Sequence, residues 1–190
     1  MDIKIANTVS PVIDLLRKRW SPRSFSTQEI SSADMQTLLE AASWSFSGGN
    51  LQPWYYVYAY GGTPGFEKIL NNLSHGNQGW AMNAAVLMVS MAKKERDPGK
   101  PNPWSKHDLG AANMQMALQA LSMNIYCHFM GGFDSIGMAE SLNIDTTVYE
   151  LVACVALGYL GDPSVLEESL QIRETAERKR KKTDEISMLI

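Results

Sequence analysis

The chain has 190 residues, of which 45% are apolar and 19% are charged, and its formal net charge is −3 with a pI near 5.6. This length and composition exclude a disordered polypeptide and allow a single domain over residues 1–190 to bury a core without disulfides or a structural metal. The acidic balance disfavours a general nucleic-acid-binding protein, which would normally be basic.

In chain order, the residue patterns predict a helix over 9–18, an extended stretch over 19–25, a helix over 31–45, a strand over 54–60, a helix over 64–74, a strand over 84–92, a loop over 93–103, a helix over 106–124, a strand over 125–130, a helix over 135–142 and a strand over 148–160. Four apolar residues of the first helix are expected to face inward: Val12, Ile13, Leu15 and Leu16. Residues 162–190 are polar and basic and lack a core-forming pattern, so this arm must either extend freely or wrap a partner. The result is an α+β domain with about four strands.

Membrane and export signals are missing from the sequence as given. The first ten residues show no charged segment followed by an apolar one, and no window approaches the roughly 18 apolar residues of a membrane span. Cys127 and Cys154 lie in apolar stretches, which favours two buried reduced thiols over a disulfide. We expect a cytoplasmic protein with no membrane association.

A basic motif with alternating polar residues follows the first helix. Arg19, Ser21 and Arg23 are two residues apart, so an extended backbone would put all three side chains on one side. Two guanidiniums and a hydroxyl on one side could hold a phosphate. The alternative is a solvated basic turn.

A glycine-containing segment separates the second helix from the first strand. Gly48 and Gly49 would let the backbone approach a large flat ligand, and Ser47, Asn50 and Gln52 offer donors and acceptors suited to the amide edge of a heterocycle. An ordinary helix stop before a strand explains the same residues equally well.

Three further motifs carry weaker signals. Asn77 lies in a Gly-Asn-Gln-Gly segment that on its own predicts a turn. Met130, Gly131 and Gly132 connect a strand to a helix, where exposed backbone N–H groups could meet an electron-rich atom. Residues 178–182 are a basic run that is either solvated, a nucleic-acid patch, or a source of phosphate ligands through Arg178 and Arg180, which are again two apart.

Several well-defined sites are missing from the sequence. It has no Gly-x-Gly-x-x-Gly, P-loop or Gly-x-Ser-x-Gly motif. His75, His107 and His128 lack metal-ligand spacing, so no metal site is expected, and His128 is interpreted as a satisfied core or interface histidine.

Taken in order, these motifs resemble the FMN-dependent nitroreductase family from about residue 16 to residue 186. The resemblance rests on Arg-x-Ser-x-Arg-x-Phe near the start, Ser-x-x-Asn-x-Gln-Pro-Trp, a helix that opens with Asp-Leu-Gly-Ala-Ala, Gly-Gly-Phe-Asp, a strand closing in Leu-Gly-Tyr, and Arg-x-Arg near the end. It implies a nitroreductase-like α+β fold, with a mainly antiparallel sheet of four to five strands flanked by helices. It also implies a homodimer with FMN sites at the subunit interface and a C-terminal arm that wraps the partner.

The resemblance implies a role for each matching position. The FMN phosphate and the pyrimidine side of the ring would be held by Arg19, Ser21 and Arg23, beside the backbone of Trp20, with Arg178 and Arg180 closing on the phosphate. The ring would be contacted by Asn77, Met130, Gly131 and Gly132. The partner's FMN would be reached by Ser47, Gly48, Gly49, Asn50 and, more weakly, Gln52. Phe46, which stands where the family usually has proline, is a candidate substrate contact. Apart from the resemblance, the loop over residues 93–104 is a candidate lid, and Trp104 either stacks on a flat substrate or anchors the core.

The function implied is an FMN-dependent oxidoreductase in which NAD(P)H reduces bound FMN and a small electron-poor acceptor, such as a nitroaromatic or a quinone, is then reduced. The flavin carries this chemistry, so no catalytic acid or base is assigned. Alternatives that stay open are another flavin reaction on the same scaffold, such as dehalogenation or flavin fragmentation, a non-catalytic flavin-binding or redox-sensing dimer, and a nucleic-acid-binding module over residues 178–182.

Overall fold

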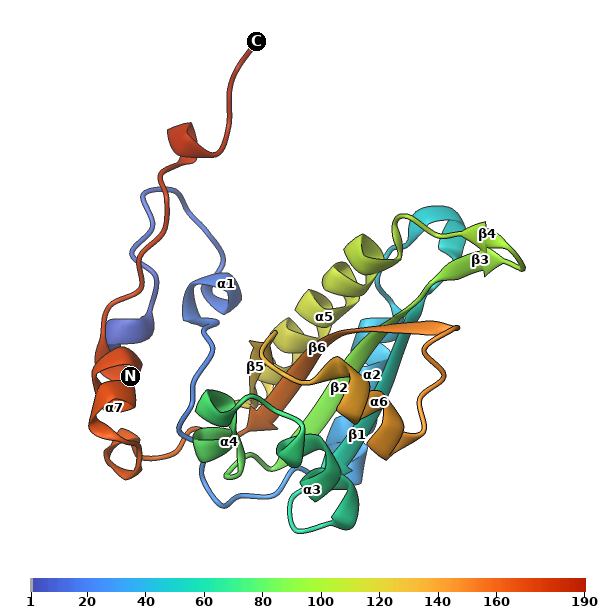
Figure 1. The fold of residues 1–190 in the computed structure, drawn as a ribbon. Helices are drawn as coiled ribbons and strands as arrows, with labels where there is room; N and C mark the ends of the chain where they lie inside the picture. Colours follow the sequence, from blue (N-terminus) through green and yellow to red (C-terminus); the bar gives the residue numbers. More distant parts are fainter. Residues whose placement is uncertain (1) are drawn as a thin grey trace.

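The structure, a computed structural model, describes residues 2–190 and is built on one four-stranded antiparallel sheet (Figure 1). The strand order is β1–β2–β6–β5, with bounds Trp54–Tyr60, Val86–Lys93, Tyr149–Gly158 and Tyr126–Met130. All three pairings are antiparallel. Strand β2 is buried along its whole length except at Lys93, as expected of a continuous apolar run. The predicted α+β class and antiparallel sheet are confirmed.

Helices cover both faces of this sheet (Figure 1). On one face, α2 (Ser32–Ser43) and α5 (Ser105–Ser122) pack against Val86, Met88 and Val155. On the other face lie α3 (Pro64–Asn71), α4 (His75–Ala81) and α6 (Ser135–Leu142). Each face of the sheet therefore has its own apolar core, and the central strands β2 and β6 contribute side chains to both.

Side-chain caps mark the starts of two helices. Ser31 caps α2, where its hydroxyl accepts the N–H of Asp34 at 3.0 Å. Asp134 caps α6 in the same way, accepting the N–H groups of Ile136 and Gly137. Because Asp134 lies two residues after Gly132, this cap fixes where the loop after β5 turns into a helix.

Three expectations about local structure are wrong. Helix α1 is shorter than predicted, at Asp14–Lys18, and Val12, Ile13 and Leu16 are exposed instead of facing inward. The segment expected to be a turn forms α4, in which Trp80 is buried despite two helical glycines. The expected loop over 93–103 contains a small hairpin, β3 (Glu95–Asp97) and β4 (Lys100–Pro101).

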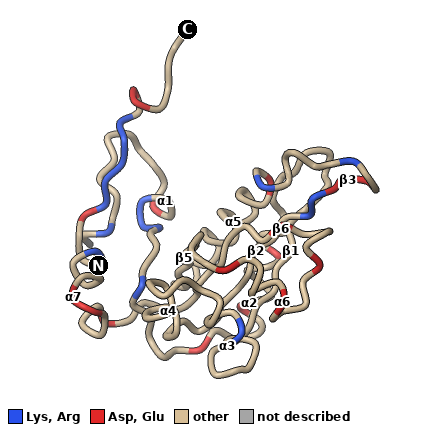
Figure 2. The backbone as a smooth tube through the Cα atoms, in the orientation of Figure 1, with Lys and Arg blue, Asp and Glu red and all other residues tan. Residues whose placement is uncertain are grey.

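The C-terminal arm carries structure of its own. It contains η3 (Pro163–Val165), α7 (Glu168–Thr175) and η4 (Thr183–Glu185), and it lies beside the N-terminal segment with η1 (Asp2–Lys4) and α1 (Figure 1). Figure 2 shows the Lys and Arg residues of the two ends running close to one another, away from the sheet. The two ends of the chain therefore form one lateral unit next to β5 and α4.

The two cysteines, Cys127 and Cys154, are buried free thiols, as predicted, and burial raises the pKa of both to about 12. Within residues 2–190, no helix combines the length and the apolar character needed to cross a bilayer.

Candidate functional site

Guanidinium groups from both ends of the chain come together beside the sheet. Burial lowers the pKa of Arg178, and the charges of Arg19 and Arg180 lower it further. Burial likewise lowers the pKa of Arg19, with Arg180 as the next contributor. Among the side chains that the structure describes, none of these three forms an ion pair within 4.0 Å. Three neighbouring guanidinium groups without a carboxylate partner among the described side chains form a site suited to an anion.

Arg178 and Arg180 differ in how their donors are used. Arg178 donates through Nη1 to the carbonyls of Lys4 at 3.1 Å and Arg17 at 2.7 Å, so it ties the C-terminal arm to the N-terminal segment. Arg180 is exposed, and its one hydrogen bond in the described part of the chain goes to the neighbouring carbonyl of Lys179. Arg180 therefore has more donors left for a ligand.

Arg23 lies in a different environment from Arg19. Its guanidinium lies over the ring of Trp80, 6.0 Å from the centroid, and its Nη1 is 3.9 Å from Oε2 of Glu174. Burial lowers the pKa of Arg23, Arg173 lowers it further, and Glu174 opposes both. The structure thus groups Arg19 with the C-terminal arginines and places Arg23 against a carboxylate of α7.

The segment between Arg19 and Arg23 packs against residues of β5. Trp20 is buried, with its ring edge-on to Tyr126 at 6.3 Å, and Ser21 is half-buried. His128 lies 2.8 Å through Nδ1 from the carbonyl of Pro22, and its ring lies 4.5 Å from that of Trp80. Burial lowers the pKa of His128 to about 4, so the imidazole is neutral at physiological pH. The sequence suggested a satisfied histidine here, but not that it supports the basic motif.

The Gly-Gly segment after β5 contacts the start of α4. The carbonyl of Gly132 accepts the N–H of Ser74 at 2.9 Å and the Nδ2–H of Asn77 at 3.1 Å. A methyl group on Gly132 would come within 2.7 Å of the Ser74 hydroxyl, whereas one on Gly131 would meet nothing within 4 Å. Gly132 is therefore required by packing, and Gly131 borders open space that a flat ligand could fill. Met130, just before them, is buried in the core.

The segment of residues 47–52 is a strained loop anchored by a buried carboxylate. Gly49, Asn50 and Gln52 all have φ between +46° and +59°, a region that costs free energy for residues other than glycine. The N–H of Gly48 donates to Oδ2 of Asp108 at 3.1 Å, and Asp108 is 2% exposed. Asp108 was noticed in the sequence only as a helix start, because its partner lies 60 residues away.

The predicted substrate residues flank this loop. Phe46 and Trp104 are 68% and 64% exposed, and both rings lie 6.0 Å from that of His107. His107 in turn contacts Oδ1 of Asp108 at 3.0 Å. A cavity of about 390 Å³ lies between the loop and the hairpin, lined by Gly48, Gly49, Leu51, Arg96, Asn102, Pro103 and Trp104.

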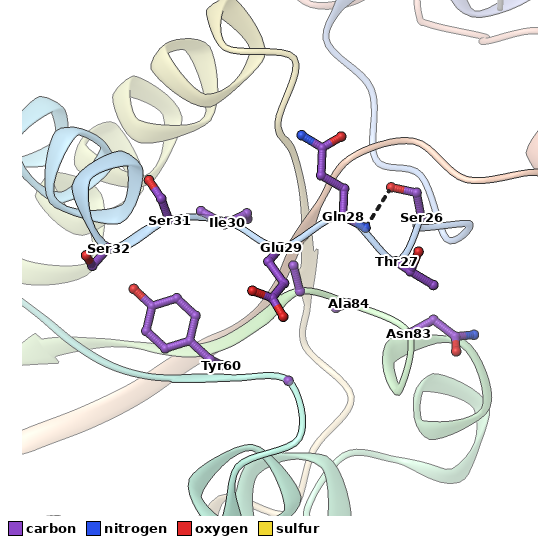
Figure 3. Close-up of a pocket in the computed structure, with 12 residues that line it drawn as sticks. Ser26, Thr27, Gln28, Glu29, Ile30, Ser31, Ser32, Tyr60, Asn83 and Ala84 are labelled. Atoms are coloured by element: carbon purple, nitrogen blue, oxygen red, sulfur yellow. Dashed lines mark hydrogen bonds between the residues drawn. The ribbon is translucent and has the colours of Figure 1, made fainter.

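A second cavity, of about 450 Å³, lies at the other end of β1 (Figure 3). Glu29 and Tyr60 point into it, and no Lys or Arg lines it. The Tyr60 hydroxyl is buried there without a hydrogen-bond partner in the described structure. Its lining makes this cavity unsuited to a phosphate. Within residues 2–190 no cluster of His, Cys, Asp or Glu could hold a metal ion.

The chain is similar to proteins of known family and structure. The model of the Nitroreductase family matches residues 16–64 and 63–159, which is most of the chain. A crystal structure of an oxidoreductase containing FMN is 33% identical, with a TM-score of 0.90, and the match covers 96% of this chain and 93% of that one.

Two more distant structures share the fold. One is a protein from Desulfovibrio desulfuricans assigned as a nitroreductase and crystallised with FMN, which is 20% identical with a TM-score of 0.78 over 96% of this chain and 98% of that one. The other, from Clostridium acetobutylicum and assigned as an NADH oxidase, is 21% identical with a TM-score of 0.70 over 92% of this chain and 98% of that one.

Proposed function

Because the chain belongs to the nitroreductase family, we propose that it binds FMN and uses NAD(P)H to reduce electron-poor acceptors such as nitroaromatics or quinones. The observation that carries the proposal is the group of Arg19, Arg178 and Arg180, which come from both ends of the chain and lack a carboxylate partner among the described side chains. A phosphate monoester carries nearly two negative charges at neutral pH and would supply the missing counter-charge.

The residues around this group fit the rest of the cofactor. Arg19 and Arg180 would hold the phosphate together with Ser21 and Arg23, and Arg178 would contribute through the donors that its carbonyl contacts leave free. The open face of Gly131 leaves room for a planar ring next to Asn77. A cation at the edge of the ring, Arg19 or Arg23, would stabilise negative charge that develops there.

The remaining predicted contacts require a second copy of the chain. In Figure 1 the segment of residues 47–52, drawn in cyan near β3 and β4, lies at the opposite end of the molecule from α1 and α7. Because this loop lies away from α1, which ends one residue before Arg19, we assign it to the partner's cofactor in a homodimer. Exposed apolar residues in and next to this loop support this assembly, because such a surface is normally covered: Trp44, Phe46, Leu51 and Trp104.

When bound, FMN supplies the two-electron chemistry that connects NAD(P)H to the acceptor. The chain's own part would be to orient the reactants. Asp108 fixes the loop through the N–H of Gly48, while Phe46 and Trp104 offer aromatic faces for a flat acceptor. The hairpin of residues 95–101 borders the same cavity and would act as its lid. The buried free thiols suit a reducing compartment, and we place the protein in the cytoplasm.

The proposal is tested by titrating the purified apoprotein with FMN and then measuring NADH and NADPH oxidation with a nitroaromatic and with a quinone. We expect one FMN per chain, a dimer by light scattering, and acceptor-dependent oxidation of the nicotinamide. Binding of FMN without turnover on any acceptor would replace the reductase with a non-catalytic flavin protein. No FMN binding at all would refute the proposal.

A further inference from the structure

Glu174 of α7 is a buried carboxylate that sequence motifs do not mark. It is 1% exposed, and its Oε1 accepts the N–H of Arg23 at 2.7 Å and the N–H of Ser24 at 3.0 Å. Its Oε2 has no hydrogen-bond partner in the described structure and lies 3.9 Å from Nη1 of Arg23. Two consecutive backbone N–H groups that converge on one anion define the local shape of the chain, so Glu174 sets the conformation of the basic motif.

The contacts around Glu174 are made by the two ends of the chain. Lys4 is 5% exposed, and its Nζ donates to the carbonyls of Arg173 at 3.0 Å and Ala176 at 2.5 Å, at the end of α7. The same ammonium lies over the ring of Trp20, 4.9 Å from the centroid. Helix α7 is thereby fixed against the N-terminal segment on the side of the basic motif.

A second attachment holds the same turn from the sheet side. The Ser24 hydroxyl donates to the carbonyl of Asp162 at 2.7 Å, and the Ser24 carbonyl accepts the N–H of Gly161 at 3.0 Å. Packing of this segment therefore does not depend on Glu174 alone. A buried carboxylate is costly when only packing is required, and the oxygen of Glu174 that accepts no hydrogen bond in the described structure is the one that faces Arg23, which points to a further use.

We propose that Glu174 is a positioning residue for the FMN phosphate: by holding the Arg23–Ser24 turn, it fixes the Arg23 guanidinium and couples the docking of α7 to phosphate recognition. This inference rests on the proposed binding of FMN. It assigns to α7 a role in the cofactor site although no α7 side chain need contact the cofactor.

The length and the charge of Glu174 can be separated by two variants. Glu174→Asp keeps the charge but withdraws the carboxylate by one methylene, so it cannot keep both backbone hydrogen bonds. Glu174→Gln keeps the length and an oxygen that can accept both N–H groups, but it loses the charge. If the position of the carboxylate oxygen matters more than its charge, Glu174→Asp weakens FMN binding more than Glu174→Gln does.

The experiment measures the dissociation constants of FMN and riboflavin for the apoprotein, since the two ligands differ only in the phosphate. We expect Glu174→Asp to weaken FMN binding by about tenfold or more and riboflavin binding by less than about twofold. Glu174→Gln should stay within about threefold of the wild type for FMN. The control Glu168→Asp, at an exposed position of the same helix, should change neither constant.

Equal losses for FMN and riboflavin in the Asp variant would mean that Glu174 serves packing only, and they would overturn the inference while the proposed function stands. Failure of the wild type to bind FMN would overturn both. If the variants do not fold, hydrogen exchange on the wild type decides, because coupling is reciprocal. FMN should protect the amides of α7 more than riboflavin does, and equal protection would refute the coupling.

Discussion

Adjacent glycines 131 and 132 should respond in opposite ways to the same substitution. A Cβ on Gly132 would lie 2.7 Å from Oγ of Ser74 and 3.1 Å from Nδ2 of Asn77, closer than carbon atoms approach oxygen without displacement. A Cβ on Gly131 would meet no atom within 4 Å. Neither glycine has a positive φ, so alanine imposes no backbone strain at either position.

The magnitudes follow from these distances. Gly132→Ala must move the Ser74 side chain and should cost about 1–2 kcal/mol, a typical cost of local overpacking. Gly131→Ala should be neutral or stabilise by up to about 1 kcal/mol, because alanine restricts the unfolded chain. For a protein of this size, a difference of about 2 kcal/mol corresponds to roughly 4–8 °C in Tm.

Urea unfolding of the two apoprotein variants measures the difference, and the double variant Ser74→Gly/Gly132→Ala supplies the control. Removing the Ser74 side chain should recover most of the loss at Gly132. FMN affinity should follow the opposite order, with Gly131→Ala the weaker binder by about tenfold, because its methyl group would occupy the space left for the ring. Equal stabilities, or no recovery in the double variant, would refute this reasoning.

Three further predictions concern the basic clusters and the supporting residues. Arg180→Ala should weaken FMN binding by about 1–3 kcal/mol with little effect on apoprotein stability, whereas Arg178→Ala should also destabilise the apoprotein, because it loses two carbonyl contacts; unchanged FMN retention in Arg180→Ala would contradict the phosphate assignment. The folded-state pKa of His128, about 4, lies below that of an unfolded histidine, so its contribution of about 3 kcal/mol should be complete above about pH 6.5 and decrease as the pH falls to 4. The free energy of unfolding of His128→Gln, measured by urea titration between pH 4 and 6.5, should therefore vary less with pH than that of the wild type. The same pH dependence in both proteins would show that His128 is not its source. Gln52→Gly should stabilise the protein by up to about 1 kcal/mol, because glycine relieves the strain of a φ of +46°. Thermal unfolding measures this change, and a lower Tm for the variant would contradict the prediction.

The sheet could be predicted from the sequence because its signals are local. The apolar run of β2 and the aromatic run of β1 identify strands whatever the rest of the chain does. The start of α2 is likewise a local signal, because Ser31 caps it. Helix α4 was missed because its sequence, with two glycines in seven residues, has low helix propensity and is stabilised by the burial of Trp80.

The residues that shape the candidate site escaped prediction because their partners are remote in sequence. Glu174 contacts residues about 150 positions away, and the carboxylate of Asp108 meets an amide 60 positions away. Glu174 belongs to no motif, and the motif that contains Asp108 does not indicate its partner, so only the fold brings the two acids to the amides that they bind. Both are buried acids that accept backbone N–H groups, and neither needs to touch a ligand to define where one binds.

In the C-terminal basic run, two residues of the same type have different roles because their surroundings differ. Arg178 and Arg180 are two positions apart and equivalent as potential phosphate ligands in the sequence. In the structure, two main-chain carbonyls hold Arg178 against the N-terminal segment, while the one hydrogen bond of the Arg180 side chain within residues 2–190 goes to its neighbour's carbonyl. Arg178 should therefore act first as the clamp that brings the two ends together, and Arg180 as the exposed charge with donors free for the proposed cofactor phosphate. Arg19 and Arg180 both lie close enough to lower the pKa of Arg178. By joining the two ends of the chain, Arg178 therefore also brings the three positive charges together, and their combined potential favours an anion beside Arg180.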